Sequence, residues 1–421
     1  MQVKRFSVNG YKNLVSEIVL EDIGAIGVIH GENNLGKSNL LEAMQLFFQL
    51  LCFNQTWKAQ LTTQELAQLG FKASEIFNLD SEIPITITAV LKIDPSELPR
   101  TQKSAFSRWM NSSEIQISIE LQKATNGFEC QISPNFWDEN QFIKLPENDT
   151  SLLSFFTQNP LVLIGVDRRI SEEEIETVRN IVPQTLLLKL YDMRDSLDRS
   201  IYKWELFVRT LQRFNDVLGE GEFVALFNRH TNRANLAFQP KNGKSGRIPI
   251  EILGSGIQQV VALVARLLVS NATFIAIEEP ELNLRYTLQL RLREIFQEIV
   301  EDQFGPQQIL ISSHSPAFEF GQHFYAMRMG FDGPLVEPRP IREANHFTQH
   351  DLNAPLTSES APMGYVSSDG LVRLPEYVRQ ALGLKQGGGV VFVKRQDSGH
   401  IELLKDEQFL ELFESIKNET E

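Results

Sequence analysis

The sequence is poor in cysteine and has no long apolar run. Only Cys52 and Cys130 occur among 421 residues, too few for a disulfide framework, so we expect a reducing, cytoplasmic environment. We interpret both as small packing or surface residues rather than nucleophiles. No segment approaches the roughly 18 consecutive apolar residues of a membrane-spanning helix, and residues 1–5 begin a strand pattern rather than a signal peptide. The sequence therefore predicts a cytoplasmic protein that does not enter a membrane.

An excess of positive charge is also lacking. The 54 Asp and Glu residues outnumber the 40 Lys and Arg residues, which gives a net charge of −14. A protein that binds nucleic acid over much of its surface is usually basic, so any DNA contact would need a local basic patch. The sequence shows no low-complexity tract and no repeat. Its length is sufficient for two or three domains with a large core.

One stretch organises the chain: residues 31–38 match the phosphate-binding pattern G-x-x-x-x-G-K-[ST]. The apolar residues 26–29 before it predict a buried strand, and a helical stripe of apolar residues follows it. This stripe consists of Leu40, Leu41, Met44, Phe47, Phe48 and Leu51. A strand, a glycine-rich loop and a helix in this order form a P-loop, in which backbone N–H groups and the helix N-terminus face phosphate oxygens.

The P-loop supplies the predicted nucleotide-binding residues. We expect Lys37 to reach the β- and γ-phosphates and the Ser38 hydroxyl to ligate Mg²⁺. The alternative, a glycine-rich turn capped by Ser38, is disfavoured because the flanking strand and helix are both present. The residues predicted to contact the nucleotide are Gly31, Asn33, Asn34, Leu35, Gly36, Lys37, Ser38 and Asn39.

Two later apolar runs end in polar residues. Residues 274–277 lead into Glu278 and Glu279, and residues 308–311 lead to His314. Carboxylates after a buried strand form the Walker B arrangement: we expect Glu278 to hold Mg²⁺ and Glu279 to orient or deprotonate the attacking water. We expect His314 to sense the γ-phosphate. Taken singly, the acids could begin a surface helix and the histidine could be structural, but their order after a P-loop favours the catalytic interpretation.

The remaining segments predict further sheets and helices. Residues 83–93, 115–121 and 129–132 read as an antiparallel sheet near the nucleotide edge, and residues 161–164 as a short buried strand. Residues 171–218 are helical and highly charged, either a protruding arm or a solvated helical subdomain. Strand-like segments return over residues 222–250, around the hairpin signal Asn242-Gly243.

The four motifs GENNLGKS, LGSGIQQ, FIAIEEPEL and ILISSHSP occur in this order within residues 1–330. This order resembles the ABC-type ATPases of the SMC, RecF and OLD-like group. The resemblance implies an α/β P-loop head, a mixed sheet with helices, in which the insertion near 171–218 separates the two parts of the head. It also implies ATP and Mg²⁺ as cofactors and dimers that hold two ATP molecules between two heads, with hydrolysis releasing the dimer.

By the same resemblance, Ser255, Gly256 and Gln258 form the ABC signature, which contacts the γ-phosphate of ATP held by the partner subunit. A glycine-rich turn at a helix N-terminus suits an anion; the alternative is that Ser255 simply caps a helix. Some features depart from the family. Many ABC proteins have Asp in place of Glu278, and no Q-loop glutamine can be assigned. The helical insertion is too short for an SMC coiled coil, and no Toprim-like nuclease domain follows.

A second, smaller domain is expected at the C-terminus. Residues 331–361 are rich in Pro, Ser, Asn and Thr and read as a linker. The pattern over about residues 365–405 resembles the swapped-hairpin AbrB/MazE domain, which implies a β-rich module at 362–421 that dimerises and often binds DNA. This module has seven basic and ten acidic residues, so a partner-docking role without DNA stays open. Its candidate phosphate-binding residues are Arg373, Arg379, Lys385, Lys394 and Arg395.

These patterns predict a Mg²⁺-dependent ATPase that works as a homodimer or higher oligomer. ATP turnover would switch a partner effector, such as a nuclease or toxin, or a clamp on double-stranded DNA. By analogy, stand-alone heads of this kind resemble ATPase components of anti-phage defence modules. The alternative is a DNA-binding transcriptional regulator or antitoxin-like module in which ATP sets the oligomeric state. The ATPase subunit of a membrane transporter is disfavoured, because the insertion at 115–250 and the C-terminal domain are unlike a compact transporter subunit and no membrane-spanning segment is present.

Overall fold

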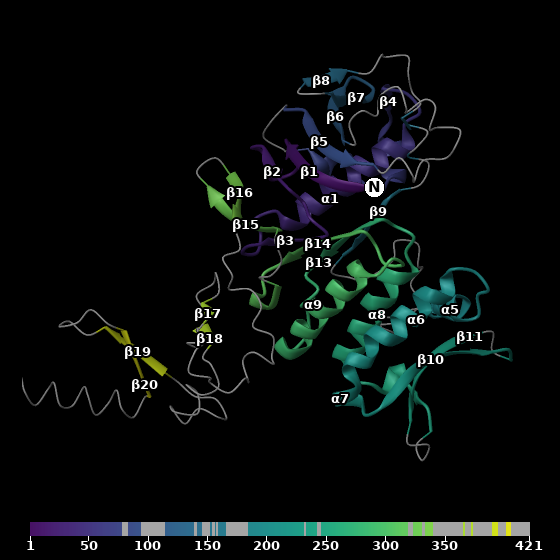
Figure 1. Ribbon diagram of the computed structural model, residues 1–421. Coiled ribbons are helices and arrows are strands. Elements are labelled where there is room, and N and C mark those ends of the chain that lie inside the picture. The colour runs from purple at the N-terminus through teal and green to yellow at the C-terminus, as the bar shows by residue number, and fades with distance from the viewer. Residues whose placement is uncertain are drawn as a thin grey trace, which may run out of the picture. The chain divides into compact units, whose positions relative to one another are not determined.

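The computed structural model contains two compact units, Met1–Ile341 and Arg342–Glu421 (Figure 1). It describes residues 1–77, 83–93, 114–138, 141–144, 152–153, 156, 159–165, 184–230, 233–241, 246–318, 323–330, 333–339, 365–366, 372–373, 390–394 and 401–405. Within these residues, no helix is long and apolar enough to cross a membrane.

The first unit is built on a six-stranded sheet in the order β16-β15-β3-β14-β13-β9. Four parallel strands, β3 (Ile26–His30), β14 (Gln308–Ser313), β13 (Phe274–Glu278) and β9 (Leu161–Ile164), confirm the predicted buried runs. Beyond them lie β15 (His323–Gly330), parallel to β3, and the antiparallel edge strand β16 (Gly333–Arg339). The sheet is therefore mixed, as the sequence predicts.

A second, antiparallel sheet confirms the strands expected between residues 83 and 132. Its order is β2-β1-β5-β6-β7-β4, and β8 pairs with β7. The strands are β1 (Gln2–Asn9), β2 (Ile18–Leu20), β4 (Lys58–Leu61), β5 (Ile85–Lys92), β6 (Glu114–Ala124), β7 (Gly127–Asp138) and β8 (Gln141–Lys144). Buried and partly exposed residues alternate along β5, as expected when one face of a sheet packs on a core.

Helix α1 (Lys37–Phe53) fills the space between the two sheets. Its side chains share one core with β1, β5 and β6 and with Phe274 and Leu310 of the central sheet. Ten of its 17 residues are buried, and a partly exposed polar stripe of Ser38, Glu42, Gln45 and Gln49 occupies the remaining side. The short helices α2 (Thr63–Gln68) and α3 (Ala73–Ile76) follow β4. The antiparallel sheet thus covers the P-loop helix along its length.

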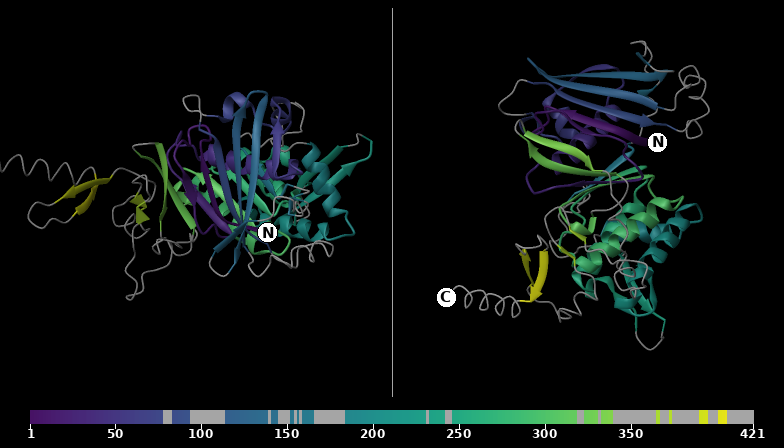
Figure 2. Two further views of the ribbon diagram at one scale, coloured as in Figure 1. Left: turned by 90° about the horizontal axis from the view of Figure 1, so that it is seen from above. Right: turned by 60° about the vertical axis from the view of Figure 1, so that its left-hand side comes forward.

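The other face of the central sheet is covered by helices. A separate core joins Ile275 and Ile277 of β13 to α8 (Ser255–Val269) and α9 (Tyr286–Glu301). Figures 1 and 2 show these layers: α1 and the antiparallel sheet on one side of the central sheet, α8 and α9 on the other. Successive residues of a strand point to opposite faces, so each strand of the central sheet serves both cores.

The described part of the charged insertion is a packed subdomain. It contains α5 (Gln184–Arg194), α6 (Ser200–Leu211), a 3-10 turn at Gln212–Phe214 and α7 (Asn215–Leu218); α5 and α6 pack on α8. Ion pairs join it to α9: Arg209 and Arg213 contact Glu298, and Arg291 contacts Asp216. The structure therefore favours the subdomain over the protruding arm for residues 184–218. Residues 171–183 lie outside the described residues.

One expectation about a loop is wrong, and one hairpin was not predicted. A hairpin that the sequence did not reveal joins β10 (Gly221–Asn228) and β11 (Arg233–Pro240). The strands flanking the predicted turn, β11 and β12 (Ile248–Pro249), do pair antiparallel, while Asn242 and Gly243 lie outside the described residues. Residues 333–339, expected in a linker, instead form β16, because they pair with β15 along the edge of the central sheet.

The second unit is described only in its strands. β17 (Tyr365–Val366) pairs with β18 (Val372–Arg373), and β19 (Val390–Lys394) pairs with β20 (Ile401–Lys405), both antiparallel. The last pair confirms the two strands expected at 390–393 and 401–404. The likeness to an AbrB/MazE domain stays a prediction, since most of the residues that carry it lie outside the described ones.

One buried side chain connects the two sheets. Gln308, the first residue of β14, is 1% exposed. Its Oε1 accepts a hydrogen bond from the Val3 N–H at 2.6 Å, and its Nε2 donates to the carbonyls of Val3, Ile23 and Gly24. The amide thereby satisfies backbone groups of β1 and of the loop before β3 that burial would otherwise leave unpaired.

We expect Gln308→Leu to destabilise the first unit by about 2–4 kcal/mol, because it leaves several buried backbone groups without partners. Urea unfolding followed by circular dichroism measures this loss. The matched control is Gln303→Leu, which removes an exposed glutamine and should change stability by less than about 0.5 kcal/mol. Equal stability of the two variants would contradict the assigned role of Gln308.

The two thiols should be unreactive in the folded protein. Burial raises the pKa of Cys52 in α1 and of Cys130 in β7 to about 12. At a pH of about 8.5, half of ordinary cysteines are thiolate, whereas fewer than about one in a thousand of these would be. We expect iodoacetamide to label the native protein at least about a hundredfold more slowly than the unfolded chain, measured by mass spectrometry. Equal rates would show that the thiols are accessible nucleophiles.

Candidate nucleotide-binding site

The P-loop joins β3 to α1 through a tightly constrained turn. Gly36 occupies the N-cap of α1 with φ of 99°, and Asn34 has φ of 65°. A Cβ on Gly36 would lie 2.7 Å from the Asn13 side-chain oxygen, and one on Gly31 would lie 2.5 Å from the Met327 carbonyl oxygen. Both positions therefore require glycine. No acidic residue lies in the first turn of α1, so its positive end is available to an anion.

Lys37 lies folded against this loop. Its side chain is buried, and Nζ donates hydrogen bonds of 2.7 Å to the carbonyl oxygens of Gly31 and Glu32. Burial lowers the pKa of Lys37, opposed by the negative charges of Glu279, Glu281 and Glu32. An ammonium that has lost much of its hydration gains from an anionic ligand at the same place.

The other predicted P-loop residues differ in their surroundings. Asn33 and Asn34 are exposed, and Ser38 lies in the first turn of α1. Leu35 is buried, where it packs into the core that surrounds α1. The Asn39 side chain donates a hydrogen bond of 2.7 Å to Asn13, which fixes the loop between β1 and β2 to the helix. Direct nucleotide contacts by Asn39 and Leu35 stay predictions, while their observed contacts position the loop.

The Walker B strand β13 presents its acids beside this loop. Phe274 and Ala276 pack with α1 and Ile275 and Ile277 pack with α8, so the alternation places Glu278 on the α1 face. A Cβ on Gly165, just beyond β9, would lie 3.4 Å from the Glu278 carboxylate.

Glu279 follows with φ of 40°, an unusual value for a residue with a side chain. Its N–H donates a hydrogen bond of 2.8 Å to the Ser312 carbonyl of β14. Such a bond holds the strained backbone in place.

A buried carboxylate that the sequence reasoning missed lies between the two strand ends. Glu281 is 4% exposed; its Oε1 accepts hydrogen bonds from the Ser313 hydroxyl at 2.7 Å and from the His314 N–H at 2.8 Å. The His314 ring nitrogen Nδ1 is 3.2 Å from this oxygen and 3.8 Å from Glu279 Oε1. The structure thus brings Glu279 and His314 together, while their catalytic roles stay predictions. The sequence signal that could have identified Glu281 is its place as the third acid of the Glu-Glu-Pro-Glu run.

The predicted Mg²⁺ ligands form a chemically suitable pair. In the described residues, no three His, Cys, Asp or Glu side chains are arranged to hold a metal ion. A magnesium ion in a nucleotide site needs only one or two protein oxygens, because phosphates and water supply the others. Ser38 lies in the first turn of α1, and Glu278 lies on the sheet face that α1 covers. A hydroxyl and a carboxylate are donors that Mg²⁺ accepts.

The predicted signature lies at the start of α8. The N-cap is Gly254, without a side-chain cap, so the interpretation of Ser255 as the helix cap is wrong: Ser255 is already the first helical residue. A Cβ on Gly256 would lie 2.9 Å from Cδ1 of Leu288 in α9, so a larger residue there would require this leucine side chain to shift. The Gln258 amide donates to the carbonyls of Leu253 and Glu251 at 2.7 and 3.2 Å and thereby holds the turn. Contacts of Ser255, Gly256 and Gln258 with a partner's nucleotide stay predictions.

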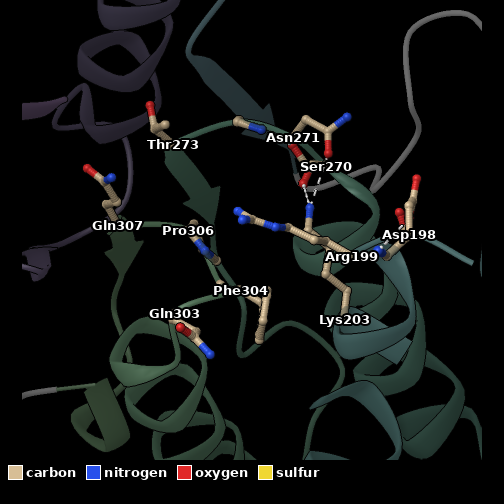
Figure 3. Close-up of a pocket in the computed structure, with 13 residues that line it drawn as sticks. Asp198, Arg199, Lys203, Ser270, Asn271, Thr273, Gln303, Phe304, Pro306 and Gln307 are labelled. Carbon is tan, nitrogen blue, oxygen red and sulfur yellow. Dashed lines mark hydrogen bonds between the residues drawn. The ribbon is translucent and has the colours of Figure 1, made fainter. Parts of the chain in front are cut away.

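A separate polar pocket lies at the opposite ends of the strands (Figure 3). Its lining includes Thr273 and Gln307, which directly precede β13 and the Gln308 start of β14. Lys203 of α6 donates to the Ser270 carbonyl and the Asn271 side chain at 3.1 Å. Because β3, β13 and β14 are parallel, the P-loop and the acids share the other edge of the sheet, and this pocket contains none of the motif residues.

We expect Gly36→Ala to abolish most nucleotide binding. A side chain at this left-handed position would be strained and would meet Asn13, so the P-loop must shift. The matched control is Gly219→Ala, since Gly219 has φ of 85° and open space around its Cβ position. Each variant should lose about 1–2 kcal/mol of stability, but only Gly36→Ala should weaken binding of a fluorescent ATP analogue more than about tenfold. Unchanged binding by Gly36→Ala would refute the P-loop assignment.

Comparison with solved structures gives the fold. The Smc head bound to the C-winged helix domain of ScpA aligns with a TM-score of 0.51 at 12% identity, covering 81% of this chain and 99% of that one. The SMC head domain from Thermotoga maritima aligns at 0.45 and 12% identity, over 81% of this chain and 100% of that chain. No curated protein sequence matches this chain significantly. The first of these alignments supports an SMC-head type of P-loop fold.

A family model described as "AAA domain, putative AbiEii toxin, Type IV TA system" matches residues 26–318. This span runs from the start of β3, through the P-loop and the Walker B acids, to just beyond His314. It includes well over half of the chain. The protein therefore belongs to this AAA-domain family of P-loop ATPases.

Proposed function

We propose that the protein binds ATP together with Mg²⁺ at the P-loop and hydrolyses it. The observation that carries this proposal is the convergence at one sheet edge of the Lys37 ammonium, the Glu279 and Glu281 carboxylates and the His314 imidazole. A cation for phosphate, a carboxylate for water and a histidine within 4 Å of that carboxylate are groups that can serve phosphoryl transfer to water.

In the proposed reaction, different residues bind the phosphates, hold the metal ion and accept the proton of the attacking water. Backbone N–H groups of residues 31–38 and the Lys37 ammonium hold the β- and γ-phosphates, with Lys37 leaving the carbonyls of Gly31 and Glu32. The Ser38 hydroxyl and the Glu278 carboxylate would hold Mg²⁺, which neutralises phosphate charge when bound. Glu279 accepts a proton from the attacking water as its oxygen bonds to the γ-phosphorus, and the bond to the bridging oxygen of ADP breaks.

We further propose that turnover acts as a switch. Ser255 and Gly256 lie at an exposed helix N-terminus without an acidic first turn, which suits the γ-phosphate of ATP held by a second copy of the chain. Hydrolysis would then separate the two copies. The family description names a toxin of a toxin–antitoxin system, and the aligned Smc head is bound to a ScpA domain. The bound ScpA domain supports a protein as the partner that is switched, and the toxin–antitoxin description is the reason to propose an effector protein, in a defence module, for that role.

We expect Lys37→Ala to reduce ATP binding at least about a hundredfold, because the phosphates lose their principal cation. Isothermal titration calorimetry with ATP and Mg²⁺ measures the affinity. The matched control is Lys203→Ala: burial also lowers the pKa of Lys203, but this lysine lines the pocket at the other edge of the sheet. The control should bind ATP normally. Undiminished binding by Lys37→Ala would refute the site.

Glu279→Gln should retain ATP binding and lose turnover by at least about a hundredfold, because the amide cannot take the proton of the attacking water. Phosphate release by the purified protein, with and without duplex DNA, measures this. If duplex DNA raises the turnover of the wild-type protein several-fold, the protein acts as a clamp on DNA. If DNA leaves turnover unchanged, a protein effector is favoured as the partner. Absence of turnover in the wild-type protein would instead support the regulator in which ATP only sets oligomeric state.

A further inference from the structure

The proposed mechanism assigns no role to Glu281, the third acid of the Glu-Glu-Pro-Glu run. It is more buried than either neighbouring acid: Glu281 is 4% exposed, whereas Glu278 and Glu279 are partly exposed. Burying a carboxyl group is unfavourable unless its oxygens find partners. A carboxyl group buried at this edge of the sheet therefore needs polar partners.

Its partners all belong to the end of β14. One oxygen, Oε1, accepts from the Ser313 hydroxyl and the His314 backbone N–H and lies 3.2 Å from His314 Nδ1. The other, Oε2, is buried without a hydrogen-bond partner among the described residues. The backbone and the ring of His314 thus both face one carboxylate.

This geometry distinguishes the two ring nitrogens of His314. Nδ1 faces Glu281 at 3.2 Å and Glu279 at 3.8 Å. The imidazole side chain is 45% exposed, so Nε2 is the nitrogen left for a ligand. A carboxylate near one ring nitrogen favours a proton on that nitrogen, which determines the tautomer of the neutral ring.

We propose that Glu281 is the positioning residue for His314, holding the ring with Nδ1 protonated so that only Nε2 serves the nucleotide. This inference rests on the proposed ATPase function and deepens it. The neutral ring then offers Nε2 as an acceptor for a water proton, and the imidazolium offers Nε2–H to a phosphate oxygen.

The first test reads the tautomer directly and needs no ATP. The protein is labelled with ¹⁵N-histidine, and the ring nitrogens are recorded by NMR at a pH of about 8, where histidines are ordinarily neutral. The His314 signals are those that disappear in His314→Ala. We expect Nδ1 protonation in the wild-type protein and a mixture of tautomers in Glu281→Gln. The matched control is Glu279→Gln, which removes the more distant carboxylate and should leave the tautomer unchanged.

The second test asks whether Glu281 acts through the histidine. Glu281→Gln keeps an oxygen for Ser313 and the His314 N–H, so the fold should persist, with a melting temperature close to that of Glu301→Gln, an exposed acid of α9. We expect Glu281→Gln to lower kcat about 10–100-fold with little change in KM. In a His314→Ala background the same substitution should lower kcat by less than about threefold.

The outcomes separate the two proposals. Protonation of Nε2 in the wild-type protein, or a tautomer that changes in Glu279→Gln but not in Glu281→Gln, would overturn the positioning role. A full additional loss of kcat in the double variant would also overturn it, because Glu281 would then act independently of His314. If the wild-type protein does not hydrolyse ATP, the ATPase function fails, while the NMR result still decides the role of Glu281.

Discussion

The parallel hydrogen bonding of β14 between β3 and β13 is the constraint on which the rest of the first unit depends. It joins segments that lie far apart in the sequence: Ile309 pairs with Ile26, and Phe274 pairs with Gln308. Since parallel strands end at the same sheet edge, this pairing brings the P-loop, the Walker B acids and His314 together. The two cores on either face of the sheet then hold the strands in register, because a slip of one residue would turn every side chain to the opposite face.

The same six-residue strand supports both ends of the structure. Gln308 begins β14 and satisfies backbone groups that connect the central sheet to the antiparallel sheet. Ser313 ends the strand and His314 follows it, and both donate hydrogen bonds to the buried Glu281. Both ends use the same principle: a single buried polar group is tolerated because several backbone or side-chain partners converge on it. At the carboxyl end of β14 the partners, Glu281 and His314, are ionisable side chains. Ionisable groups in such a network can take part in catalysis as well as stabilise the fold.

The sequence was informative where a local pattern has only one structural solution. The P-loop, its helix and the four buried strands were predicted because hydrophobic periodicity and fixed glycine spacing act over a few residues. Sequence patterns were misleading where a segment's structure depends on contacts with residues that are remote in the chain. Residues 333–339 are rich in loop-forming residues but become β16 because the edge of the sheet accepts them. Gln258 occupies a position of the predicted signature motif, yet its amide donates a hydrogen bond that holds the turn before α8.

The sequence by itself therefore determined the P-loop fold and the candidate catalytic residues Lys37, Glu278, Glu279 and His314, because each belongs to a short motif. Only the tertiary structure decided which of these groups meet. It placed Glu281 against His314 and showed that the described charged helices pack on α8 and α9 rather than protrude. The physical reason is that hydrogen bonds and ion pairs depend on distances of a few ångströms between segments whose separation along the chain carries no such information.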